Sequence, residues 1–311
     1  MKLSQHLAKF APAALALAWA FSAGTATAAD KLPVVASFSI LGDIVRAVGG
    51  DRVEVSTLVG PDQDAHVFEP TPADAKKVAQ SKLLVSNGLG FDPWLGKLSR
   101  SAGYKGASVV ASAGVKSIRA VPEESHDHDH DHDHGDVDPH AFQDPTKVMA
   151  YVRNLSAALA KADPAGAEVY KTNAAAYQAQ LTELDGWAKQ QFAAIPKAKR
   201  KVITSHDAFG YLGARYDITF LAPQGISTES EASAKDVAAL IRQIKKDRIK
   251  AVHVENMTNP KLLEQLSREA GVTMGSELYA DALSATGGPA DSYLKLMRYN
   301  IGELVKSMKL N

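Results

Sequence analysis

The residues of this chain best suited to chemistry are its histidines, which occur in a sequence without cysteine. Five of the ten histidines alternate with aspartate in one short run: His126, His128, His130, His132 and His134. Outside that run and the first 29 residues, the histidines are His66, His140, His206 and His253. Without thiolates, any metal must be held by imidazole or carboxylate groups. The lack of cysteine also excludes disulfides, cysteine nucleophiles and iron–sulfur clusters.

Three of these histidines and one aspartate are expected in loops at the ends of elements. His206 directly follows a predicted strand, and His66 lies between the predicted strand 53–59 and the next helix. His140 lies in a loop stiffened by prolines, and Asp281 follows the predicted strand 272–275. Each one alone is an ordinary solvated polar group. Because open α/β sheets bind ligands at the carboxyl ends of their strands, the four together indicate a binding site.

Two further residues have a different setting. His253 lies inside the predicted strand 251–254, so we interpret it as a hydrogen-bonded core histidine without a ligand role. Glu255 follows two residues later, and the sequence leaves two interpretations open. It is either a carboxylate that reaches the ligand or a carboxylate on the surface of its lobe.

The elements that must position these residues alternate between strands and helices. The predicted strands cover residues 32–37, 53–59, 83–86, 202–204, 218–221, 251–254 and 272–275. Apolar spacing predicts helices over residues 40–48, 234–246 and 260–269, and Thr71 and Pro72 mark the start of another. Strands separated by helices predict an α/β fold with parallel sheets and helices on their faces.

Between the two halves, residues 164–196 show an apolar stripe at helical spacing and no strand pattern. A helix of ~32 residues would be ~48 Å long. We therefore predict a linking helix over 164–196, a first lobe over 30–163 and a second lobe over 197–311. Two shorter helices broken near Asp185 and Gly186 are the alternative.

Residues 123–138 cannot form a core, because Val137 is their only apolar side chain. We interpret this segment as a solvated loop that collects metal ions weakly through its five imidazoles. A polar insertion without function is the alternative.

The first 29 residues have the pattern of a secretory signal peptide. Lys2 and Lys9 precede an apolar stretch over residues 10–21, and Ala26, Thr27 and Ala28 form a small-x-small cleavage site. Twelve apolar residues are too few to span a bilayer. Because no cysteine is available for lipidation, we expect a free periplasmic protein.

Composition and motifs exclude several classes of function. The whole chain of 311 residues has a formal charge of zero, and removal of the leader leaves −2, so no basic surface for nucleic acid is expected. Phosphate-binding loops, dinucleotide fingerprints and the H-E-x-x-H and G-x-S-x-G motifs are absent. The sequence therefore predicts no enzyme of these kinds.

Six segments in order resemble the metal-binding subfamily (cluster A-I) of periplasmic solute-binding proteins that serve ABC importers, most closely its zinc-binding branch. The segments are GPDQDAHVFEPTPAD, NGLGFDPWLGKL, DPHAFQDP, SHDAFGYL, VENMTNPK and YADALS. The resemblance implies two (β/α) lobes joined by one long rigid helix, with the metal in the cleft between them. It also implies four metal ligands: His66, His140, His206 and Asp281.

Two departures from that family matter. Some zinc members have an acidic residue before the first ligand, where this chain has Ala65. Some also have a disulfide in the second lobe, whereas this chain has no cysteine. Manganese members tend to have glutamate where this chain has His206. Three imidazoles and one carboxylate suit a tetrahedral Zn²⁺ site, whereas an oxygen-rich set suits Mn²⁺.

The sequence thus predicts a zinc-binding receptor that delivers Zn²⁺ to the membrane permease of an ABC importer. We expect a monomer that binds no nucleic acid. A further partner that the sequence leaves open is a periplasmic donor protein that supplies metal to the histidine loop. Neutral imidazoles are needed, so affinity should fall below pH ~6.5. The alternatives are a manganese receptor of the same subfamily, a zinc-dependent hydrolase in which Asp281 is the general base, and a zinc buffer or adhesin without a transporter.

Overall fold

The structure is a computed structural model that describes residues 30–119 and 137–311. The predicted signal peptide lies outside the described residues, as does the predicted metal-collecting loop except for Val137 and Asp138. In the described part of the chain, no helix combines the length and the apolar character needed to cross a membrane.

The first lobe is a four-stranded parallel sheet in the order β2-β1-β3-β4. Its strands are β1 (Leu32–Phe38), β2 (Val53–Val59), β3 (Leu83–Ser86) and β4 (Ala107–Val110). Its helices are α1 (Ser39–Gly49), α2 (Pro72–Gln80), α3 (Trp94–Ser101) and α4 (Pro145–Ala162). The predicted start of α2 is confirmed by a capping box, in which Thr71 and Asp74 exchange hydrogen bonds. The short and largely exposed β4 was not predicted, since it lacks the buried apolar pattern of the other strands.

The second lobe repeats this arrangement as a parallel sheet in the order β6-β5-β7-β8. Its strands are β5 (Lys201–Ile203), β6 (Thr219–Leu221), β7 (Ala251–Val252) and β8 (Thr273–Met274). Its helices are α6 (Gly210–Tyr216), α7 (Ala234–Asp247), α8 (Lys261–Ala270) and α9 (Tyr293–Leu310). The predicted strands are present, but β7 and β8 are shorter than the apolar runs that predicted them.

Helix α5 (Ala167–Ala193) is a single helix of 27 residues between the two sheets in the chain. At 1.5 Å per residue its length is about 40 Å. The alternative of two helices broken near Asp185 is wrong, because the helix is continuous through Gly186. Its predicted apolar stripe is buried: Tyr170, Ala174, Tyr177, Leu181, Leu184, Ala188 and Phe192. The exact segment boundaries at residues 163 and 196 remain predictions.

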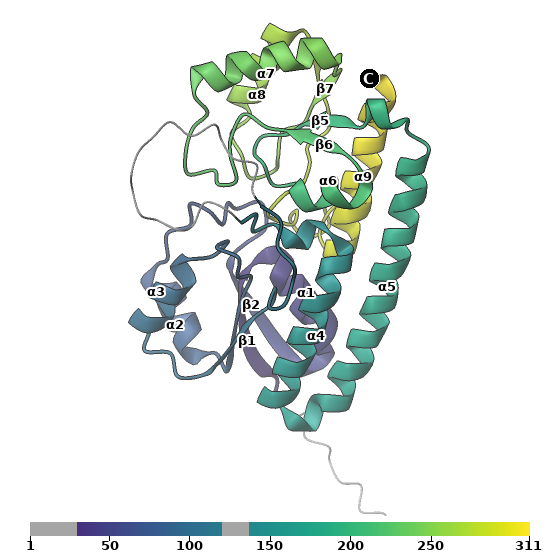
Figure 1. Cartoon of the computed structure of the whole chain (residues 1–311). Coiled ribbons are helices and arrows are strands. Elements are labelled where there is room, and N and C mark those ends of the chain that lie inside the picture. Colours follow the sequence, from purple (N-terminus) through teal and green to yellow (C-terminus); the bar gives the residue numbers. More distant parts are fainter. Residues whose placement is uncertain (1–29, 120–136) are drawn as a thin grey trace, which may run out of the picture. The chain divides into compact units, whose positions relative to one another are not determined.

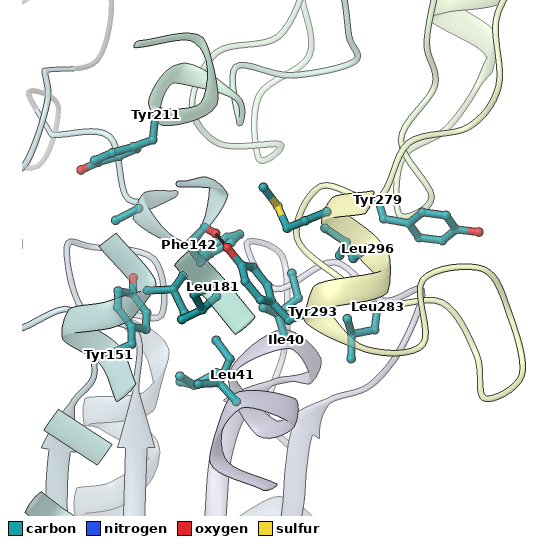
Figure 2. Close-up of a cluster of buried hydrophobic side chains, with 14 of the residues drawn as sticks. Ile40, Leu41, Phe142, Tyr151, Leu181, Tyr211, Tyr279, Leu283, Tyr293 and Leu296 are labelled. Atoms are coloured by element: carbon teal, nitrogen blue, oxygen red, sulfur yellow. Dashed lines mark hydrogen bonds between the residues drawn. The ribbon is translucent and has the colours of Figure 1, made fainter. Parts of the chain in front are cut away.

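The core extends continuously from the first lobe into the second. Figure 1 shows α4 and α9 packed along α5, and Figure 2 shows how side chains of both lobes meet there. Leu41 of α1, Leu181 of α5 and Leu296 of α9 belong to one buried cluster. The hydroxyl of Tyr293 donates to the carbonyl of Phe142 at 2.8 Å, which ties α9 to the first lobe. Thus α9 packs beside the linking helix and adds to the contact between the lobes.

Candidate metal centre

Each of the four predicted ligands occupies a loop near the carboxyl ends of the strands of a sheet. His66 lies in the loop between β2 and α2, and His140 immediately precedes the short 3-10 helix Ala141–Gln143. His206 follows β5, and Asp281 lies between β8 and α9. Because the strands of each sheet are parallel, their carboxyl ends share one edge, and these loops are thereby brought together.

The four side chains form one compact cluster. Each residue offers one ligand atom, and these four atoms all lie within 4.8 Å of one another. Asp281 Oδ2 is 3.1 Å from His66 Nε2 and 3.1 Å from His206 Nε2. His140 Nε2 is 3.3 Å from His66 Nε2 and 3.6 Å from Asp281 Oδ1. Three imidazole nitrogens and a carboxylate therefore face a common point.

The cluster is almost completely removed from solvent. His140 and His206 are 0% exposed and Asp281 is 1% exposed. His206 Nε2 and Asp281 Oδ1 have no hydrogen-bond partner within the described residues. Buried polar atoms are nearly always hydrogen-bonded, so two such atoms without hydrogen bonds in one cluster of potential ligands indicate a bound cation. The donor set fits a divalent transition metal.

The electrostatics of the cluster favour a positive charge at its centre. Although burial lowers the pKa of His140, the Asp281 and Asp138 carboxylates raise that pKa to about 9. The pKa of His206 is likewise raised well above its usual value, since Glu255 and Asp281 outweigh burial. Burial raises the pKa of Asp281, but the two imidazoles reverse this and hold the pKa well below its usual value. Asp281 is thus ionised at neutral pH and attracts cations.

The structure confirms the interpretation of His253. Its ring is buried, with Nδ1 2.6 Å from the carbonyl of Ser276 and Nε2 2.7 Å from Ser307 Oγ. Burial lowers its pKa. Because both ring nitrogens are engaged elsewhere, His253 has no free ligand atom for the cluster.

Two buried carboxylates behind two of the predicted ligand histidines were not assigned a role from the sequence. Glu255, for which surface exposure was one interpretation, is 0% exposed and accepts hydrogen bonds from His206. Asp138 accepts from the backbone N–H of His140 and contacts its Nδ1, both at 2.9 Å. The spacing D-x-H at Asp138 is one signal that could have found it, because aspartate readily accepts from the backbone two residues on.

The loop that carries His66 is also bound to the second lobe. Asp62 accepts a hydrogen bond from Asn256 Nδ2 at 2.8 Å, and Asp64 accepts one from the hydroxyl of Thr228 at 2.6 Å. These contacts place the loop over the cluster and join residues more than 160 positions apart. The sequence had no pattern that indicated them.

Comparison with known proteins places the chain in a family. Residues 34–307 match the family model described as "Zinc-uptake complex component A periplasmic". The chain is 30% identical over 285 residues to the manganese-binding lipoprotein MntA of Halalkalibacterium halodurans, with 92% of this chain and 91% of the relative covered. It is 31% identical over 292 residues to the iron ABC transporter substrate-binding lipoprotein MtsA of Streptococcus pyogenes, with 92% of each covered.

Among solved structures, the periplasmic zinc-binding protein TroA of Treponema pallidum superimposes with a TM-score of 0.82 at 26% identity. That match covers 89% of this chain and 99% of TroA. The relatives' names thus include manganese, iron and zinc.

The two curated relatives are named lipoproteins, which conflicts with the expectation of a protein without a lipid anchor. That expectation rests only on the absence of cysteine. The expectation that the chain is not an enzyme is confirmed by its family, and the hydrolase alternative is wrong. The chain belongs to the family of zinc-uptake complex component A, whose members are extracytoplasmic metal-binding substrate-binding proteins of ABC transporters.

Proposed function

We propose that this protein is a periplasmic receptor that binds Zn²⁺ through His66, His140, His206 and Asp281 and delivers it to the permease of an ABC importer. The observation that carries the proposal is the buried cluster of three imidazoles and one carboxylate whose ligand atoms lie within 4.8 Å of one another. Four protein ligands leave no open position for a reacting water, so the site suits retention and transfer of the ion. The metal is cargo, and the protein acts as a monomer.

The ligand types favour zinc. Imidazole nitrogen is a good ligand for Zn²⁺, and a set of three nitrogens with one oxygen fits its tetrahedral preference. Mn²⁺ prefers more oxygen ligands. Ala65 beside His66 offers no additional carboxylate.

Manganese is the second candidate, and one feature of the site favours it. Both oxygens of Asp281 face imidazoles of the cluster, Oδ2 toward His206 and Oδ1 toward His140. A carboxylate in this position can bind through both oxygens and raise the coordination number. The relative MntA is named manganese-binding.

The two metals are distinguished by transport in cells. A strain that lacks this protein should grow poorly in metal-depleted medium, and added zinc should restore growth at concentrations where manganese does not. Uptake of radioactive zinc and manganese in the deletion and complemented strains measures the same difference directly. Rescue by manganese alone would replace the zinc assignment. A strain with no uptake deficit for either metal would favour a zinc buffer or adhesin.

Zinc affinity should increase with pH at least to about pH 9. His140 has a pKa of about 9, and a metal ion must displace its proton. Each displaced proton changes the apparent affinity roughly tenfold per pH unit below that pKa. The dependence therefore begins well above the pH of ~6.5 expected from unperturbed imidazoles. Competition with a chromophoric chelator at pH 6, 7 and 8 measures it, and a constant affinity over this range would contradict the assignment of His140.

The histidine run at residues 126–134 is proposed to raise the local metal concentration near the site, by proximity rather than tight binding. Deletion of residues 123–136 keeps Asp138 and should leave one tight zinc site while removing several weak ones. Calorimetric titration of the deleted and full-length proteins checks this. Loss of the tight site would mean that the run itself binds the cargo. A donor protein that loads the run remains a proposal.

A further inference from the structure

Two of the three imidazoles in the cluster have a carboxylate against the ring nitrogen that faces away from the cluster. Glu255 accepts from His206 Nδ1, and Asp138 Oδ1 lies 2.9 Å from His140 Nδ1. Both carboxylates are buried. Within the described residues, neither is paired with a lysine or arginine. Burial of a carboxylate without such a partner costs free energy because the charge loses its hydration, so its other contacts must offset that loss.

The sheet register brings Glu255 to His206. Ile203 of β5 pairs with Val252 of β7. His206 comes three residues after Ile203, and Glu255 comes three residues after Val252. One oxygen of Glu255 accepts the backbone N–H groups of Ser205 at 2.9 Å and His206 at 3.1 Å. The other oxygen contacts His206 Nδ1. Both oxygens are therefore committed.

The contact has a chemical consequence for the imidazole. A carboxylate can only accept, so the ring nitrogen that faces it must carry the proton. In a neutral imidazole with its proton at Nδ1, the lone pair is at Nε2. For His206 and His140, Nε2 is the nitrogen that faces Asp281.

We propose that Glu255 and Asp138 are positioning residues that hold His206 and His140 in the one tautomer able to bind the metal. The inference rests on the proposed coordination by these two histidines. His66 lacks this support, since the only carboxylate that its ring contacts in the described part of the chain is Asp281, through Nε2. Glu255 is the stronger case, because its second oxygen is engaged by the backbone.

The substitution Glu255→Gln tests the proposal because glutamine has only one acceptor oxygen. If that oxygen keeps the two backbone N–H groups, the amide NH₂ faces Nδ1 and forces the ring proton to Nε2, where it blocks the metal. The opposite orientation of the amide places its NH₂ group against the two backbone N–H groups, which are also donors and cannot hydrogen-bond to it. We expect the Kd for zinc to rise 10–100-fold, as is usual when the partner of a metal-bound histidine is removed.

The substitution Asp138→Asn separates the charge of the second carboxylate from its role as an acceptor. Asp138 uses the single oxygen Oδ1 for both the backbone N–H and Nδ1 of His140. Asparagine can place its oxygen there and keep the tautomer while it loses the charge. We expect a severalfold rise in Kd for this variant, smaller than that of Glu255→Gln, whereas Asp138→Ala, which removes the acceptor, should behave like Glu255→Gln.

Nitrogen-15 correlation spectra of the histidine rings in the zinc-loaded proteins report the tautomer directly. In the wild type and in Asp138→Asn, His206 and His140 should show a protonated Nδ1 and a metal-bound Nε2. The pattern of His206 should be lost in Glu255→Gln. A general loss of packing would lower the melting temperature of the protein without this selective change.

The outcomes separate the proposals. An affinity in Glu255→Gln within about twofold of the wild type, with unchanged ring spectra, overturns the positioning role. Equal losses in Glu255→Gln and Asp138→Asn would assign the effect to charge and overturn it also. If Glu255→Gln does not fold, the contrast between Asp138→Ala and Asp138→Asn makes the same test. Tight binding that persists in His206→Ala would instead refute the proposed metal site.

Discussion

His206→Ala is expected to abolish tight metal binding by this protein. The side chain is fully buried, and its Nε2 faces the cluster without a hydrogen-bond partner. Its removal leaves three of the four proposed ligands and also leaves Glu255 without the ring that contacts its carboxylate. The loss should exceed the 10–100-fold effect of removing an outer partner of a metal ligand. Titration with zinc in competition with a chelator measures it.

Thermal unfolding provides a second measurement of the same loss. A ligand at 1,000 times its Kd stabilises the folded state by about 4.1 kcal/mol, so zinc should raise the melting temperature of the wild type strongly. His206→Ala should show little of this increase. His253→Gln is the matched control, because His253 is equally buried in the same lobe but has both nitrogens bound to serine residues. It should be less stable, yet it should keep the full response to zinc.

Asp281→Asn is expected to have the next largest effect. Asp281 is the one acidic residue among the four proposed ligands and lies against all three imidazoles, at 3.1 Å from His66 and His206 and at 3.6 Å from His140. The amide is neutral, so it removes the anionic ligand and should raise the Kd for zinc about a hundredfold or more, beyond the range for outer partners.

The same substitution should change the pH dependence of binding. Asp281 is the main cause that raises the pKa of His140 to about 9. Without it, the imidazoles should lose their protons at lower pH, so zinc affinity should vary less between pH 7 and 9 than in the wild type. Asp185→Asn is the control, because Asp185 is a buried carboxylate held by Arg215 and Tyr216. A wild-type affinity in Asp281→Asn would exclude the carboxylate as a ligand.

Much of the fold could be predicted because local patterns specify it. The capping box at Thr71, the run Val53–Val59 and the buried stripe of α5 all follow from residues close in the sequence. Short strands were missed, as β4 was, or predicted too long, as β7 and β8 were. Strand β7 ends at Val252. Just beyond the end of the neighbouring strand β5, the side chain of Glu255 accepts hydrogen bonds from the backbone N–H groups of Ser205 and His206. A side chain that replaces part of a sheet ladder has no signature in a single sequence.

The amino-acid composition sets the chemistry available to this protein: imidazoles and carboxylates without thiolates, carried at the ends of predicted strands. Which of these groups lie next to one another depends on the packing of the whole fold. His66 and Asp281 are 215 residues apart in the chain and 3.1 Å apart in the fold. The same packing also decides that Glu255 is buried behind His206, because burial and pairing depend on strand register between β5 and β7. Residue types fix which ligand groups exist, whereas long-range packing fixes their distances and their burial.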